Sequence, residues 1–184
     1  MEWNRSETLA LSSAKCKHCT GTGLHERPGQ PDGPCHCVLR AIFRACFRRF
    51  VECAETVSLE ISVTHNTGGG WSRKNEEYMA DFELIVRRTL TPEEHRIFRY
   101  HYLLGADSRL CCRKLGMEKG SFFHVIYRIQ HKLGQAFRET EPYGLYPTDE
   151  YFVTMIRDRQ VSKIVTMPEP KPAGANRIPV KRAA

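Results

Sequence analysis

The sequence is first informative through the patterns that it does not contain. It has no apolar run near the roughly 18 uncharged residues that a membrane-spanning helix requires. Its first fifteen residues, MEWNRSETLALSSAK, lack the basic start and the apolar core of a secretory signal. We therefore expect a cytoplasmic protein with no membrane partner, in which a reducing environment keeps cysteines as thiols.

Sequence patterns of common enzyme classes are also missing. The glycine-rich stretch NTGGGWSRKN, residues 66–75, reads as a loop but does not match the phosphate-binding pattern G-x-x-x-x-G-K-[ST]. There is no H-E-x-x-H zinc-protease motif, and no nucleophile–base pair or carboxylate dyad stands at a readable spacing. The sequence predicts a protein that is not an enzyme and has no small-molecule substrate.

Positive charge is unevenly distributed along the chain. The composition, 41% hydrophobic and 27% charged, is that of a globular protein, and the formal net charge is +7. Between Arg109 and Arg138 a single acid, Glu118, stands among seven cationic side chains. These are Arg109, Arg113, Lys114, Lys119, Arg128, Lys132 and Arg138. The concentration indicates an anionic partner for this segment.

Four of the eight cysteines lie in one turn-rich window, CKHCTGTGLHERPGQPDGPCHC. Two close pairs, C-x-x-C and C-x-C, are joined by a Pro/Gly-rich connector that must reverse direction. A tetrahedral zinc ion accepts four thiolates, and a closed shell of this kind leaves no position for a catalytic water. We predict that structural Zn2+ is bound by Cys16, Cys19, Cys35 and Cys37.

Other interpretations of the window remain open or fail on spacing. Because the second pair is one residue short of C-x-x-C, a histidine (His18, His25 or His36) is a possible substitute ligand. A nucleobase-deaminase site needs H-x-E and P-C-x-x-C, but Glu26 directly follows His25. The remaining cysteines are expected to be small buried apolar side chains. They are Cys46, Cys53, Cys111 and Cys112.

Apolar periodicity predicts a mainly α-helical fold. An amphipathic helix starts at Val38 with an arginine stripe opposite its apolar face, and the following VSLEISVTH suits either a strand or more helix. Thr91, Pro92 and Glu94 form a helix start with a capping box. Four segments follow: 1–37, a zinc knuckle; 38–89, helical with a Gly-rich loop; 90–140, helix-turn-helix; and 141–184, a mostly flexible extension with a disordered basic tail.

The segment DSRLCCRKLGMEKGSFFHVIYRIQHKL predicts a short helix, a turn at Gly116 and a longer basic helix, which is a helix-turn-helix. The second helix buries an apolar face and presents a polar one. The buried set is Phe122, Val125, Ile126, Ile129 and Leu133, and the exposed set is Lys119, His124, Arg128, His131 and Lys132. A second helix of this kind enters the major groove of double-stranded DNA, where cations neutralise phosphates.

Residues Leu90 to Glu139 resemble region 4 of sigma-70-type factors, particularly the extracytoplasmic-function group. The likeness rests on LTPEEHRIFRYHYLLG and KLGMEKGSFFHVIYRIQHKL. It implies a tetrahelical domain that reads a promoter element or touches RNA polymerase. The DNA-facing positions carried over are Lys119, Ser121, Phe123, His124 and Arg128, of which Phe123 and His124 depart from the usual polar or basic readers.

CKHCTGTG is similar to a short zinc motif of phage Q-type antitermination proteins. We therefore expect a bacterial or phage DNA-binding transcription regulator in the bacterial cytoplasm or the phage-infected host, contacting RNA polymerase and carrying structural zinc. The alternative is an adaptor that docks on the transcription machinery without sequence-specific DNA binding. The predicted DNA-binding set is Lys119, Ser121, Phe123, His124, Arg128, His131 and Lys132.

Overall fold

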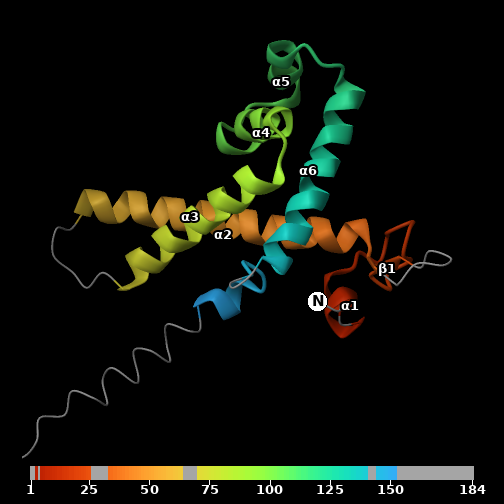
Figure 1. Cartoon of the computed structure of the whole chain (residues 1–184), viewed down its shortest axis with the longest axis horizontal. Helices are drawn as coiled ribbons and strands as arrows, with labels where there is room; N and C mark the ends of the chain where they lie inside the picture. The colour runs from red at the N-terminus through yellow and green to blue at the C-terminus, as the bar shows by residue number, and fades with distance from the viewer. Residues whose placement is uncertain (1–2, 4, 26–32, 64–69, 141–143, 153–184) are drawn as a thin grey trace, which may run out of the picture. The chain divides into compact units, whose positions relative to one another are not determined.

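The computed structural model describes residues 3, 5–25, 33–63, 70–140 and 144–152, and the predicted disordered tail lies outside them. The prediction of a mainly helical protein is confirmed (Figure 1). The elements in chain order are α1 (Arg5–Leu11), β1 (Leu24–His25), β2 (Gly33–Pro34), α2 (His36–Val63), α3 (Gly70–Thr89), α4 (Pro92–Phe98), the π-helix η1 (Arg99–Leu103), α5 (Ser108–Leu115) and α6 (Lys119–Glu139).

The core forms where α2 packs against α6 and α3 (Figure 1). Aromatic side chains fill it: the Phe82 ring lies 4.5 Å from that of Phe50 and 4.8 Å from that of Phe137, measured between centroids. Cys46, Cys53 and Cys111 are fully buried as predicted, whereas Cys112 is half-buried. Residues from Met1 to Phe152 form one compact unit. The division of the chain into four segments stays a prediction.

The crossing of α2 and α6 requires a glycine. A Cβ atom at Gly134 would lie 2.0 Å from the carbonyl oxygen of Leu39, far inside van der Waals contact. The backbones of the two helices therefore approach each other at this point more closely than any side chain allows. This contact fixes the start of α2, which follows the cysteine window, against the second half of α6.

Two stretches that the sequence did not identify as helical belong to helices. The segment left open between strand and helix continues α2 as far as Val63. The prediction of a loop over 66–75 is wrong for 70–75, because α3 begins at Gly70, and 66–69 lie outside the described residues. Tertiary packing explains the difference: Asn75 is buried, and its Oδ1 accepts a hydrogen bond from the Cys53 thiol at 3.4 Å.

The predicted helix start at Thr91 is confirmed. Its hydroxyl accepts from the Glu94 N–H, the Glu94 carboxylate accepts from the Thr91 N–H, and Pro92 occupies the first turn. The α-helix that starts at Pro92 ends at Phe98, however. After α4 the chain widens into the π-helical turn η1, and Gly105 follows with a φ of 63°.

The chain after α6 returns to the core. Leu145, Tyr151 and Phe152 are buried. The Tyr151 hydroxyl donates to Asp81 Oδ2 at 3.0 Å, which ties this segment to α3. In the described part of the chain, no helix combines the length and the apolar character needed to cross a bilayer.

Candidate functional site

Tight turns and a short strand pair bring the two cysteine pairs together. After α1 the chain turns tightly through Gly21 and Gly23, whose φ angles are 93° and 76°. β1 then pairs with β2 in antiparallel register, Leu24 opposite Pro34, so the predicted reversal of the connector is confirmed. The Cys35 N–H donates to the Gly23 carbonyl at 2.8 Å, which places the second pair beside the first.

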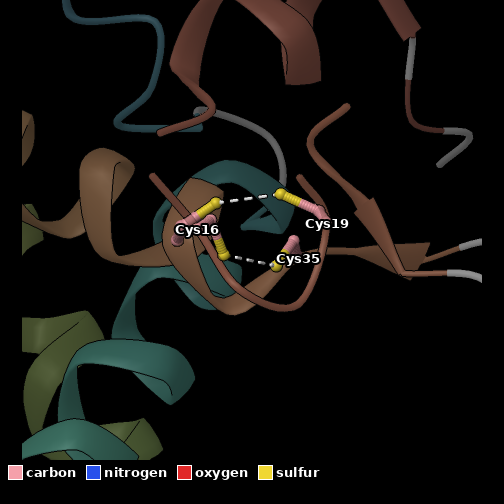
Figure 2. A group of neighbouring side chains, drawn as sticks. Cys16, Cys19 and Cys35 are labelled. Carbon is pink, nitrogen blue, oxygen red and sulfur yellow. Dashed lines mark hydrogen bonds between the residues drawn. The ribbon is translucent and has the colours of Figure 1, made fainter. Parts of the chain in front are cut away.

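The four sulfurs converge on one point, as Figure 2 shows for the labelled Cys16, Cys19 and Cys35. All four Sγ atoms lie within 4.8 Å of one another. The Cys16–Cys35 separation is 3.7 Å and the Cys19–Cys37 separation is 3.6 Å. A tetrahedron of sulfurs about 2.3 Å from a zinc ion has edges of about 3.8 Å. The group Cys16, Cys19, Cys35 and Cys37, called the cysteine centre below, therefore fits a tetrahedral metal ion.

Electrostatics at the cysteine centre differ from one thiol to the next. The N–H groups of His18 and Cys19 donate to the Cys16 sulfur and lower the pKa of its thiol to about 6. Burial raises the pKa of Cys35 to about 12 and also raises that of Cys37. Because buried thiolates next to one another are costly, a bound cation is the natural source of compensating charge.

The same geometry bears on the alternative interpretations of the window. Sulfur separations of 3.6 and 3.7 Å are far longer than the roughly 2.05 Å of a disulfide bond, so these thiols are not paired. Among the described residues, the group whose ligand atoms converge contains cysteines alone. His18, His25 and His36 lie beside it, with ring centroids 6.3 to 6.4 Å from one another.

The basic segment forms a pair of helices joined by a tight turn. Asp107 caps α5 by accepting from the Leu110 N–H at 2.7 Å, and Gly116 ends α5 in the left-handed conformation with a φ of 64°. The α6 helix begins three residues later, as predicted. Its buried apolar face includes Phe122, Ile126, Ile129 and Leu133, while Val125 is half-buried.

The residues predicted to face DNA divide into two groups. Lys119, Ser121, Phe123, His124 and Arg128 are exposed. His131 and Lys132, further along α6, are half-buried. The His131 ring lies 4.4 Å from that of His36 at the start of α2, so His131 faces the cysteine window rather than open solvent.

The buried acid Glu94 forms ion pairs with two of the cations that were expected to contact phosphates, and the sequence did not predict this pairing. The Glu94 side chain is 3% exposed and accepts from Arg128 Nε at 2.8 Å and from Lys132 Nζ at 2.9 Å. Burial opposes its charge, but the hydrogen bond from Lys132 and the Thr91 N–H keep the pKa of Glu94 below its usual value. The sequence predicts the capping role of Glu94, and the fold adds its ion pairs with Arg128 and Lys132.

Ion pairing thus leaves the accessible positive charge on a smaller part of the helix pair. Arg138 is also engaged, donating to Glu7 at 2.7 Å. The other four cations of the segment are exposed, and none has an ion pair within the described part of the chain. They are Arg109, Arg113 and Lys114 on α5 and Lys119 at the first residue of α6.

Comparison of the chain with protein-family models, with curated proteins and with solved structures found no match. Any function must therefore be argued from the cysteine centre and the helix pair themselves.

Proposed function

We propose that this protein is a DNA-binding transcription regulator in which α5 and α6 act as a helix-turn-helix. The observation that carries the proposal is the exposure of four cations on α5 and at the start of α6, beside the exposed Ser121 and His124. Cations of this kind neutralise phosphates, and polar side chains at the start of a recognition helix reach base edges in the major groove.

The cysteine centre has a structural part in this proposal, with Zn2+ as the ion. Four thiolates match the preference of structural zinc sites and leave no open position for chemistry at the metal. The centre joins the turn after α1 to the start of α2, and α2 packs along α6. Zinc therefore stabilises the frame from which α6 projects.

A contact with RNA polymerase or another protein of the transcription machinery is the second part of the proposal. Three leucines next to the helix pair are exposed, Leu103 by 41%, Leu104 by 62% and Leu110 by 39%. Leu103 and Leu104 lie at the end of η1, and Leu110 lies on α5 beside Arg109 and on the helix face of Arg113 and Lys114. If these leucines provide the whole function, the protein is the adaptor rather than the DNA reader.

Fluorescence anisotropy of a labelled duplex, titrated with zinc-loaded protein over a series of salt concentrations, tests the proposal. We expect log K to fall linearly with log salt, with a slope of about −0.9 for each phosphate contacted. The variant Arg113→Ala should reduce that slope, whereas Arg73→Ala, which changes an exposed arginine of α3, should not. Absence of binding to any duplex at low salt would reject DNA reading and leave the adaptor.

A further inference from the structure

A pocket of about 490 Å³ opens between the cysteine window and α6. Its walls come from three separate parts of the chain. His18 belongs to the first cysteine turn, His36 and Arg40 to the start of α2, and His124, Tyr127 and His131 to α6. The volume falls within the range of about 300–1,000 Å³ that is typical of sites for small organic groups rather than single ions.

The pocket is lined by flat rings and one fixed guanidinium. The Arg40 guanidinium lies 4.7 Å from the centroid of the Tyr127 ring. Its position is set by a hydrogen bond from Arg40 Nε to Gln130 Oε1 at 2.8 Å. Gln130 in turn donates to the Tyr102 hydroxyl at 2.7 Å, so the cation is anchored to the core. Arg40, which belongs to the arginine stripe expected on this helix, therefore lines the pocket.

The pocket continues the polar face of α6. Ser121, His124, Tyr127, Arg128 and His131 fall within about 120° of one another around the helix axis, and we call this set the α6 stripe. Its first residues are exposed and include the predicted base readers, while His124, Tyr127 and His131 line the pocket. A nucleic acid bound along the α6 stripe would therefore bring its bases to the mouth of the pocket.

Charge favours an uncharged ring over a phosphate as the occupant. Cys16 and Cys37 form part of the wall, and four thiolates around one divalent ion carry a net charge of about −2. That charge repels a phosphate but not a nucleobase. Among the described residues, none of the side chains that line the pocket is acidic, and Arg40 and the His124 imidazole offer hydrogen bonds to base oxygens and nitrogens.

We propose that this pocket binds an unpaired nucleobase, packed against the aromatic rings of Tyr127 and His124 and hydrogen-bonded at its edge by Arg40. Stacking on aromatic side chains tolerates every base, because each base has a π-face. The inference rests on the proposed function in that both use the α6 stripe, but it predicts a preference that duplex binding alone does not give. The protein should favour DNA with an unpaired base over fully paired DNA.

The test uses the full zinc-loaded chain and two probes of equal length, a paired duplex and the same duplex with one unpaired 2-aminopurine. We expect tighter binding of the second probe and quenching of the 2-aminopurine fluorescence. Tyr127→Ala should weaken binding of that probe roughly 5-fold or more and abolish the quenching, as expected for the loss of one stack. Tyr127→Phe should retain both, because the ring remains.

Controls separate the pocket from the fold and from duplex binding. Arg40→Ala should reduce the preference for the unpaired base, whereas Arg44→Ala, an exposed arginine one turn further along α2, should not. Equal binding of both probes without quenching would overturn the pocket proposal and leave the proposed function standing. Binding of the unpaired probe alone, lost in Tyr127→Ala, would support the pocket and contradict duplex reading.

Discussion

The cysteine centre and the α5–α6 pair are stabilised in opposite ways. Cys16, Cys19 and Cys35 lie in turns or directly after a two-residue ladder, and Cys37 is the second residue of α2. The four sulfurs converge from positions up to 21 residues apart in the sequence. The helix pair instead has its own caps at Asp107 and Gly116 and a buried apolar face on α6. We therefore propose that a bound ion stabilises the first region, whereas local signals and the shared core stabilise the second.

This difference has a consequence for function. A region held by an ion can be released without unfolding the rest, whereas a region built into the core can be lost only with the core. The cysteine window and α6 come into contact where His36 lies against His131, and α2 crosses α6 at Gly134.

Removing a metal ligand should have the largest effect, and only on one region. Cys35→Ser removes one of the four ligands and should reduce the metal content from one ion per chain to none, measured by native mass spectrometry. The effect should be large because zinc binding contributes about 10–16 kcal/mol of folding free energy in zinc-finger peptides. Amide exchange should then accelerate in the turns over 12–25 but not in α6. Cys112→Ser, outside the cysteine centre, is the matched control and should keep its ion. An unchanged metal count in Cys35→Ser would remove this residue from the ligand set.

Widening the helix crossing should affect the second region directly. Gly134→Ala places a methyl group against the Leu39 carbonyl, and we expect the free energy of unfolding to fall by about 1–3 kcal/mol or more. Gly120→Ala, on the same helix with nothing within 4 Å of the added carbon, should raise it by up to about 1 kcal/mol. Thermal denaturation of both variants checks the pair. Equal melting temperatures would contradict the close approach.

Glu94→Gln should lower stability and raise DNA affinity together. The substitution weakens the hydrogen bonds from Arg128 and Lys132, and the loss of such a bond to a charged group lowers the free energy of unfolding by up to about 1.5–3 kcal/mol. It also frees both cations to contact phosphates. The folded pKa of Glu94 is lowered, so its contribution is present above the unfolded pKa and is lost as pH falls through the folded value. Denaturation between pH 7 and pH 3 should therefore show less acid destabilisation in Glu94→Gln than in the parent, and an identical loss would contradict this role.

The smallest effect distinguishes free cations from paired ones. Arg113→Ala should reduce the salt slope of duplex binding by about 0.9. Arg128→Ala should reduce it by less, because Glu94 already shares that guanidinium. Anisotropy titrations at several salt concentrations compare the two variants. A larger change for Arg128 than for Arg113 would mean that DNA displaces the Glu94 contact.

Local chemistry explains which parts of the fold could be predicted from sequence. Thr91 with Glu94 and Gly116 with its left-handed turn are signals that act over three or four residues, and both are confirmed. The cysteine centre was also predictable, since close spacing brings the sulfurs of each pair together and a connector that reverses direction brings the two pairs together. Apolar periodicity likewise identified the buried face of α6.

What escaped sequence reasoning depends on contacts between distant residues. The first turns of α3 start with a glycine and are mostly polar, and their helical state relies in part on the hydrogen bond between Asn75 and Cys53. The pairing of Glu94 with Lys132 and of Arg40 with Gln130 joins residues 38 and 90 positions apart. Tyr127 could have been included, because it lies one turn after His124 on the same helix face.

The central claim is that α5 and the start of α6 grip DNA while the cysteine centre only supports them. Amide hydrogen exchange of the zinc-loaded chain, measured with and without duplex DNA, tests it most directly. We predict that DNA slows exchange between 108 and 121 and leaves the turns around the cysteine centre unchanged. Protection confined to those turns, with α5 and α6 unaffected, would contradict the account.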